Sequence, residues 1–553
     1  MKKYKKIKLV SFPIGLLFLF VLNSTTPLWS QVSPPKKYRN IAMTAGSIAV
    51  PQERTLEWKK TSAFAQSMYK AIAEKKITDK MMVTKESAAR ILLARLLLKQ
   101  NIAEVNQTIQ KLRVWGNCGS SWALNPKGDY DFPLTILTTI LWKFGDQPDI
   151  LYPETKNYLL NVLLSEDGGK FRYTAPKTLG LHVETENHML MTGGSRYLKN
   201  RWIAQHGNTD AYYDNVKNGL EAKLLSLMGE MKQNGLVEFN SIPYLGFTVT
   251  ALLNLEAFGS EKVRTEARAV LDYINFSYAL SSYHLRHYPP MRRRYDKAGI
   301  KELSVDYNTA FMKSWLSYLE GVPFDPNMTL GKEHAAMGAC MPYRPADKVV
   351  ELLFDKGDGY FVRQGHGPKA SPEISSAGKH FLISSGGVNR GKKSEIVARP
   401  ICLFLDDNAN HLSKVIHLAG PGTDYMKWNN TGVYENFACA AGPVFIPKGM
   451  TAVATEGNWA VYAVAKKVTV VVYSTPKLGL MAVFEDVAPQ AIFKEVLKTN
   501  ANPQLLQTSF TFPSGNKLTY DVLAKKDQWV MIAQNGKALD RAFDSWPLID
   551  GDL

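Results

Sequence analysis

Cysteine is scarce in this chain, and its scarcity excludes two kinds of site. Only four cysteines occur in 553 residues. None stands in a Cys-x-x-Cys pair, the spacing common to zinc sites and redox motifs, and four scattered residues are too few for a disulfide framework. We therefore expect no zinc site, and no other pattern in the sequence implies a metal or a cofactor.

Long apolar runs are scarce as well. The run at residues 9–22 follows the basic segment MKKYKKIK, and residues suited to cleavage lie near Ser30. This order is typical of a secretory signal peptide at residues 1–30, because the run is short for a membrane span. We expect a periplasmic or secreted protein with no membrane partner after cleavage. A retained N-terminal anchor is the alternative.

Acidic residues are outnumbered by basic ones. The chain has 67 Lys and Arg against 50 Asp and Glu, a formal charge of +17, and removal of the five lysines in residues 1–30 leaves +12. An exported basic protein rarely meets nucleic acid, so an acidic polysaccharide is the expected partner. The oligomeric state is left open.

The two halves of the chain differ in the period of their apolar residues. From about residue 55 to 330 the spacing is helical, whereas after 341–349 short alternating, β-branched runs follow, with a hairpin turn at Pro513–Asn516. We predict an α+β multidomain protein, with a helical domain at 31–345 and an antiparallel β-sandwich at 346–553. Helical segments are expected at 87–112, 130–144, 155–165, 220–231, 244–258 and 264–282.

One helical stretch, VETENHMLMTGGSRYL at 183–198, begins with polar groups. Glu186, Asn187 and His188 place a carboxyl, an amide and an imidazole within one turn. Taken alone, such a tripeptide is more often a hydrogen-bonded helix start than a functional site. Two glycines follow at 193–194, and each costs about 1 kcal/mol relative to alanine in a helix. We expect them to allow close helix packing that holds the polar turn at a cleft.

A second stretch, EFNSIPYLGFTVTALLNLEAF, passes from polar residues into an apolar helix at Ser241–Pro243. Serine before proline is a helix-start signal. Tyr244 then falls in the first turn, where the helix dipole modestly favours a phenolate, and Glu238 precedes it. A tyrosine at such a position is usually a packing residue.

The remaining candidates lie in loops. The segment SSYHLRHYPPMRRRYDK contains Tyr283, His284 and the run Arg292, Arg293 and Arg294. Arginine forks bind carboxylate and sulfate in a bidentate manner, although a solvated basic loop explains the segment equally well. In the β half, His366 and Trp428 could line a sugar groove or could serve as loop packing.

A family resemblance connects these stretches. The order TENHMLMTGGSRYL, FNSIPYLGFTVTALLNL and HYPPMRRRY, with a helical domain before a β domain, resembles the (α/α)-toroid polysaccharide lyases of the heparinase II/III and alginate-lyase type. It implies a toroid of helical hairpins, in agreement with the absence of a fixed repeat. It also implies that Asn187, His188 and Tyr244 flank an acidic polysaccharide. Glu186 stands where the alginate-lyase pattern often has a second Asn.

Such lyases act by β-elimination, which requires neutralisation of a uronate carboxylate and removal of the neighbouring proton. Asn187 and the arginines of the run at 292–294 are expected to neutralise the carboxylate. Tyr244 or His188 is expected to be the base, and a tyrosine could return the proton to the leaving oxygen. The expected binding surface is completed by Glu186, Glu238, Tyr283, His284, His366 and Trp428.

Two other functions remain open. A glycoside hydrolase on the same fold needs two opposed carboxylates, for which Glu186 or Glu238 could pair with Asp129 or Asp131. The third possibility is an exported glycan-binding protein that keeps the cleft without the chemistry.

Overall fold

The computed structural model describes residues 55–552 apart from internal gaps. The predicted signal peptide lies outside the described residues, so the structure does not test it. The gaps fall at residues 86–87, 165–173, 294–298, 321–331, 368–369, 388–395, 408, 421–431, 466 and 526–527.

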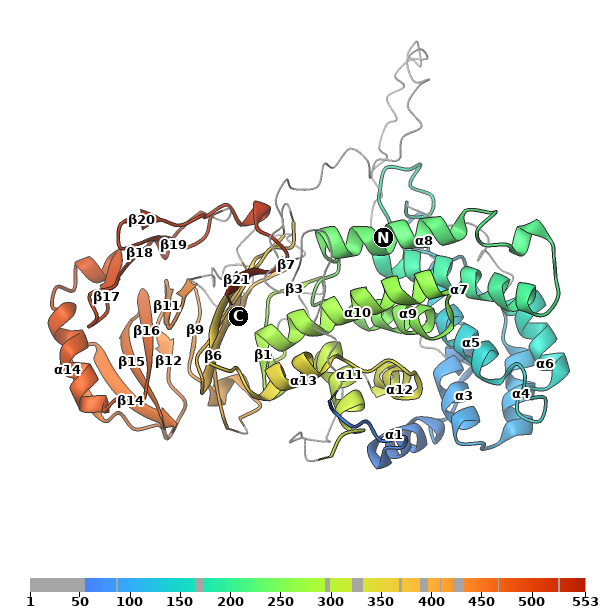
Figure 1. The fold of residues 1–553 in the computed structure, drawn as a ribbon, viewed down its shortest axis with the longest axis horizontal. Helices are drawn as coiled ribbons and strands as arrows, with labels where there is room; N and C mark the ends of the chain where they lie inside the picture. Colours follow the sequence, from blue (N-terminus) through green and yellow to red (C-terminus); the bar gives the residue numbers. More distant parts are fainter. Residues whose placement is uncertain are drawn as a thin grey trace, which may run out of the picture. The chain divides into compact units, whose positions relative to one another are not determined.

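Helices occupy the N-terminal half of the described chain, as the sequence predicts (Figure 1). Their bounds are α1 Ala63–Ala73, α2 Asp79–Met82, α3 Ala88–Leu97, α4 Ile102–Lys111, α5 Asp131–Phe144, α6 Pro153–Tyr158, α7 Glu186–Gln205, α8 Leu220–Asn234, α9 Leu245–Phe258, α10 Glu261–Ser281, α11 Tyr307–Leu316, α12 Lys332–Cys340 and α13 Asp347–Phe354.

Two details differ from the sequence prediction. The segment 87–112 is not one helix, because Lys99 and Asn101 adopt left-handed backbone angles (φ 53° and 51°) between α3 and α4. The helical region also continues past residue 345, since α13 precedes the first strand of the large sheets, β4 at Tyr360–Gln364. Local apolar spacing cannot distinguish one bent helix from two consecutive ones.

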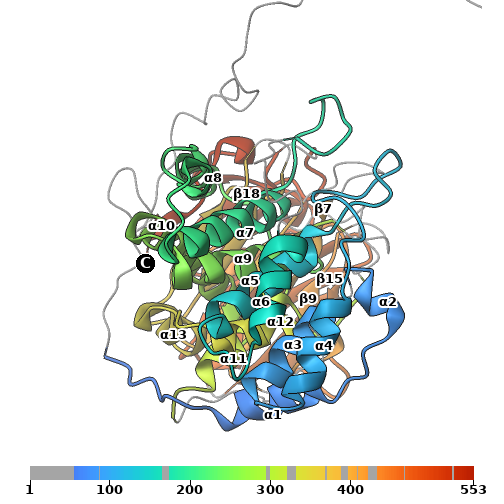
Figure 2. The same cartoon turned by 90° about the vertical axis from the view of Figure 1, so that its right-hand side faces the viewer.

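Helices α5, α7 and α9 form the centre of the helical half. Helix α7 packs against α5, α8 and α9, and α9 packs against α10 and α12 (Figure 2). Almost every residue of α9 is buried, as are most residues of α7. Helices enclosed on all sides are expected to lack a solvated polar face. The polar residues of these helices therefore need a specific explanation.

Strands occupy the C-terminal half, and their pairing is antiparallel throughout (Figure 1). One large sheet has the order β10-β11-β16-β15-β14-β13, a second has β12-β9-β8-β6-β5-β4-β21, and a smaller one has β17-β18-β19-β20. The predicted turn at Pro513–Asn516 connects β17 to β18.

The bounds of the remaining elements complete the fold. They are β1 Ser282–Tyr283, β2 Arg286–His287, β3 Met291–Arg292, β5 Glu373–Ala377, β6 Phe381–Gly386, β7 Ile396–Val397, β8 Arg399–Leu405, β9 His417–Leu418, β10 Val433–Tyr434, β11 Phe437–Ala440, β12 Val444–Phe445, β13 Ala454–Glu456, β14 Trp459–Ala465, β15 Val468–Thr475, β16 Leu478–Glu485, α14 Pro489–Thr499, β17 Ser509–Thr511, β18 Lys517–Tyr520, β19 Met531–Gln534, β20 Lys537–Ala538 and β21 Asp550–Asp552.

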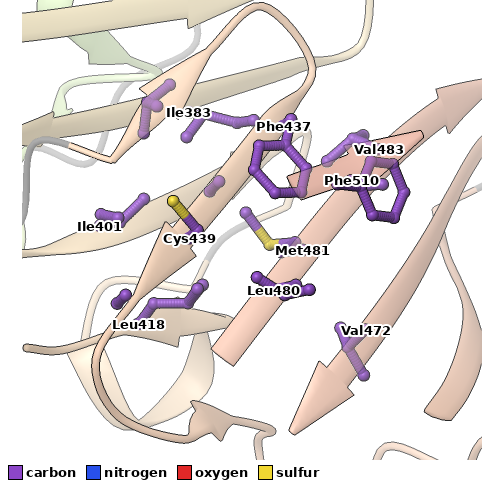
Figure 3. Packing of buried hydrophobic residues seen from close by; sticks show 14 of the residues in the cluster. Ile383, Ile401, Leu418, Phe437, Cys439, Val472, Leu480, Met481, Val483 and Phe510 are labelled. Carbon is purple, nitrogen blue, oxygen red and sulfur yellow. The ribbon is translucent and has the colours of Figure 1, made fainter. Parts of the chain in front are cut away.

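The two large sheets share one apolar core. Ile383 and Ile401 from β6 and β8 belong to the same buried cluster as Cys439 and Met481 from β11 and β16 (Figure 3). Cys439 is a free thiol. Burial of this apolar surface, rather than any covalent link, accounts for the association of the two sheets.

Within the described residues, no helix combines the length and apolar character needed to cross a membrane.

One glycine of α7, Gly194, can be compared with Gly246 of α9 by the space that a Cβ would have at each position. A Cβ at Gly194 would meet Leu255 of α9 at 3.6 Å, an ordinary contact, whereas a Cβ at Gly246 would meet the Tyr307 ring at 2.8 Å. Gly194 therefore faces another helix, as predicted, but the packing leaves room for a methyl group.

We expect Gly194→Ala to raise the free energy of unfolding by about 1 kcal/mol, because alanine is the better helix former. The matched variant Gly246→Ala should lower it by about 1–3 kcal/mol through overpacking. Urea denaturation measures both changes. Destabilisation by Gly194→Ala as large as that by Gly246→Ala would contradict this description of the α7–α9 contact.

Candidate functional site

A polar pocket lies where three helices begin. It encloses about 390 Å³ of open space, including its solvent-facing part. Helix α5 begins at Asp131, α7 follows its N-cap residue Thr185, and α9 follows its N-cap residue Tyr244. The lining residues are Lys85, Ser120, Ser121, Asp129, Thr185, Asn187, His188, Glu238, Tyr244 and Arg293. The structure thus brings together the three predicted catalytic residues, with Glu238 and Arg293 beside them.

The start of α7 is held by hydrogen bonds of its own side chains, one of which reaches the loop at Ser120. Glu184 accepts hydrogen bonds from the backbone N–H of Ser120 at 2.9 Å and of Thr185 at 3.1 Å. The Thr185 hydroxyl donates to Asn187 Oδ1 instead of capping the helix. These bonds fix the turn that carries Asn187 and His188.

Asn187 has an unused donor. Its side chain is 1% exposed and its Oδ1 is engaged by Thr185, yet among the residues that the structure describes its Nδ2 has no hydrogen-bond partner. A buried amide without a partner costs about 1–3 kcal/mol. Because Asn187 lines the pocket, a ligand oxygen there would remove this penalty.

His188 is paired with a buried carboxylate. Its Nδ1 lies 2.6 Å from Asp131 Oδ2, and both side chains are buried. Burial alone lowers the pKa of the imidazole, but the charge and hydrogen bond of Asp131 outweigh it and raise the pKa to about 9. The Asp131 carboxylate therefore favours the imidazolium form of His188, while burial raises the pKa of Asp131 itself. Since Nδ1 is engaged, Nε2 is the nitrogen available to a ligand.

Tyr244 is accompanied by an ion pair. Arg293 Nε lies 2.7 Å from Glu238 Oε1, and the Arg293 guanidinium lies 5.9 Å from the centre of the Tyr244 ring. Tyr244 is partly exposed, whereas Glu238 is buried. The tyrosine hydroxyl therefore stands at the pocket with a positive charge beside its ring.

Glu186 lies behind the pocket lining. Its Oε1 accepts the backbone N–H of Glu238 at 2.8 Å, while its buried Oε2 has no hydrogen-bond partner within the described part of the chain. Burial, followed by the charge of Glu238, raises the pKa of Glu186 to about 7. The bond joins the first turn of α7 to the segment that leads into α9.

Other predicted residues lie outside the lining. Tyr283 and His284 are in the β1–β2 hairpin, where His284 Nε2 is 3.3 Å from Asp406 Oδ1 and its backbone N–H donates to Leu353. Arg292 donates its backbone N–H to the Phe239 carbonyl at 3.1 Å. These side chains are not among those that line the pocket, and their part in substrate binding stays a prediction. Neighbouring strand residues point to opposite faces, and sequence spacing does not reveal which face meets the pocket.

His366 belongs to a neighbouring buried network. Its Nε2 lies 2.9 Å from Glu373 Oε1, and its ring stacks on Phe239 with centroids 4.0 Å apart. Asn240 donates to the same carboxylate oxygen. His366 thus contacts the segment that carries Glu238 without lining the pocket. Arg294 and Trp428 lie outside the described residues.

Sequence reasoning missed part of the pocket. Lys85 Nζ lies 3.2 Å from Asp129 Oδ2, which also accepts the Ser121 hydroxyl at 2.7 Å. Lys85, Ser120 and Ser121 stand in unremarkable polar segments, so no local signal could have identified them. Asp131 was considered only as a hydrolase acid, whereas it is the partner of His188.

No metal-binding arrangement occurs in the part of the chain that the structure describes: no three His, Cys, Asp or Glu side chains gather as ligands.

No protein-family model matches the sequence, and no curated protein matches it. The function is therefore inferred from the pocket itself.

Glu186 gives the site a testable pH dependence. Its pKa is raised on folding, so its contribution to stability is present at low pH and is lost as the pH rises through about 7. Glu186→Gln keeps an acceptor for Glu238 but cannot ionise. We expect this variant to match the wild type near pH 5 and to exceed its free energy of unfolding above pH 8 by roughly 1–3 kcal/mol.

The measurement is urea denaturation at the two pH values. Glu256→Gln is a matched control, because Glu256 is also buried but forms an ion pair with Arg268. This control should lose stability at both pH values. A Glu186→Gln effect that is independent of pH would contradict the assigned protonation.

Proposed function

We propose that this protein is an exported polysaccharide lyase that cleaves an acidic, uronate-containing glycan by β-elimination. The observation that carries the proposal is the gathering of Asn187, His188 and Tyr244 at one pocket. An amide, an imidazolium and a phenol are the groups that this reaction needs. The motif order that resembles the heparinase II/III and alginate-lyase type supports the same proposal.

Recognition of the uronate carboxylate is assigned to Asn187 and His188. The unpaired Nδ2 of Asn187 and the Nε2 of the His188 imidazolium are donors suited to carboxylate oxygens. Three helix N-termini at the pocket add partial positive charge. Neutralised in this way, the carboxylate makes the proton on the adjacent carbon more acidic.

Tyr244 is assigned the proton transfers. Because Asp131 favours the protonated form of His188, Tyr244 is the base of the proposed reaction. As phenolate, it takes the proton from the carbon beside the carboxylate, a carbon–carbon double bond forms, and the bond to the glycosidic oxygen breaks. The same proton can return to the leaving oxygen. Arg293 lies beside the ring that carries this negative charge.

The architecture of such a lyase is part of the proposal. Helices α5, α7 and α9 begin at one pocket and therefore run in the same direction, whereas α8 and α10 pack outside α7 and α9. This alternation supports an (α/α) toroid with an inner and an outer layer. The shared core of the two large sheets supports a β-sandwich.

A glycoside hydrolase is the second candidate, because Asp129 and Glu238 both line the pocket. However, Asp129 is paired with Lys85, and Glu238 is paired with Arg293. Both carboxylates are thus engaged in ion pairs within the protein, whereas a hydrolase needs the two to act on the glycosidic bond and on water or the sugar.

One assay separates the candidates. A lyase leaves a double bond conjugated to a carboxylate, so ultraviolet absorbance should grow while an acidic polysaccharide is digested. A hydrolase produces reducing ends without this absorbance, and a glycan-binding protein produces neither. Reducing ends without absorbance would replace the lyase by the hydrolase.

Single substitutions test the assigned roles. Tyr244→Phe should lower kcat by roughly 10²–10⁴-fold with binding nearly unchanged, because it removes only the proton-transfer group. Asn187→Ala should also lower turnover through loss of carboxylate neutralisation. Tyr283→Phe is a matched control, because Tyr283 does not line the pocket, and it should leave kcat unchanged. Equal effects of Tyr244→Phe and Tyr283→Phe would exclude Tyr244 as the base.

A further inference from the structure

A short hairpin precedes α7 and presents apolar side chains to solvent. Residues 174 and 183 pair across it, and the Ala175 N–H donates to the His182 carbonyl at 2.9 Å. The tip is a tight turn in which the Leu181 N–H donates to the Thr178 carbonyl at 3.0 Å. Leu179 is 94% exposed and Leu181 is 80% exposed.

The stability of the fold does not account for a leucine at position 179. Its backbone is left-handed (φ 54°), a conformation that disfavours bulky side chains and that glycine or asparagine adopts more readily. Its side chain also gains almost no burial. A leucine that strains the backbone and gains almost no burial in the described fold points to a contact with another molecule.

The hairpin is anchored at its base. The Trp122 indole N–H donates to the Pro176 carbonyl at 2.8 Å, and the Pro176 ring packs close to Gly119. Thr178 is buried and donates its hydroxyl to the Ala175 carbonyl at 2.7 Å. The exposed leucines therefore project from a fixed support.

The charged side chain of the hairpin itself is basic. Lys177 is exposed in the same hairpin, and the sequence contains no acidic residue between Asp167 and Glu184. Glu184 is itself buried and engaged by Ser120. Leucines beside a lysine, with no neighbouring carboxylate in the hairpin, are complementary to an anionic lipid surface.

We propose that the tip at Leu179–Leu181 docks the protein on an anionic lipid bilayer. Two leucines are far too small for a stable protein interface, which buries about 800 Å² per partner. Sugar rings are usually held by aromatic faces, and the nearby Trp122 already bonds to the hairpin. Insertion of a few apolar side chains among lipid headgroups fits the size and charge of the tip. The proposal differs from the expectation, made from the sequence, that the protein has no membrane partner after signal cleavage.

Docking would also position the pocket. Glu184 and Thr185 follow the hairpin directly, and Ser120 and Ser121 of the supporting loop line the pocket. The pocket would therefore lie beside the lipid surface. The docking proposal does not depend on the reaction at the pocket.

The experiment is co-sedimentation of the full chain with phosphatidylcholine vesicles, with and without phosphatidylglycerol. Burial of one leucine corresponds to about a tenfold change in a partition coefficient, so Leu179→Ser with Leu181→Ser should weaken binding to the anionic vesicles at least tenfold. Lys177→Glu should also weaken it, most at low salt.

The matched control is Leu505→Ser with Leu523→Ser, two exposed leucines of the β half. Comparison of variants removes any contribution of the N-terminal apolar run, which all of them share. A Leu179→Trp reporter should show a blue shift of its fluorescence on binding. Equal binding of the tip and control variants, or no binding to vesicles, overturns the proposal. The proposal is also overturned if the tip variant binds vesicles normally and loses affinity only for polysaccharide, because the tip would then bind the glycan.

Discussion

The convergence of three helix N-termini is the constraint on which the site depends. Each helix start leaves backbone N–H groups unpaired and carries partial positive charge, and burial of three such ends at one place requires acceptors. Asp131 begins α5, Glu184 accepts the N–H of Thr185 at the start of α7 and the N–H of Ser120 from another loop, and Glu186 accepts the N–H of Glu238. The acids that crowd this region therefore serve the fold first.

The segment between α8 and α9 depends on both halves of the chain. Glu186 binds it at Glu238 from the helical side. From the β side, Glu373 of β5 accepts a bond from Asn240, and His366 stacks on Phe239. Because this segment leads into Tyr244, the position of the tyrosine rests on contacts from two regions that are far apart in sequence. The β half therefore contributes to the geometry of a pocket that it does not line in the described residues.

Apolar periodicity predicted the helix positions, and the family resemblance implied the gathering of Asn187, His188 and Tyr244, which local patterns alone did not favour. It could not predict which loops complete the pocket, since Lys85 and Ser120 owe their place to tertiary packing alone. Composition also grouped Tyr283 with the arginines that follow it. Such local composition does not determine to which face of a two-residue strand each side chain points.

The charge balance of the pocket bears on the ligand. Lys85 pairs with Asp129, Arg293 with Glu238, and His188 with Asp131, so each cation already has an anion. Glu186 does not line the pocket, and its raised pKa of about 7 reduces its negative charge near neutrality. What remains for a ligand is hydrogen-bond donation from Asn187, from His188 Nε2 and from the three helix ends. Affinity for a carboxylate would then come from oriented donors in a fixed frame, and it would depend on salt less steeply than the net charge of the chain suggests.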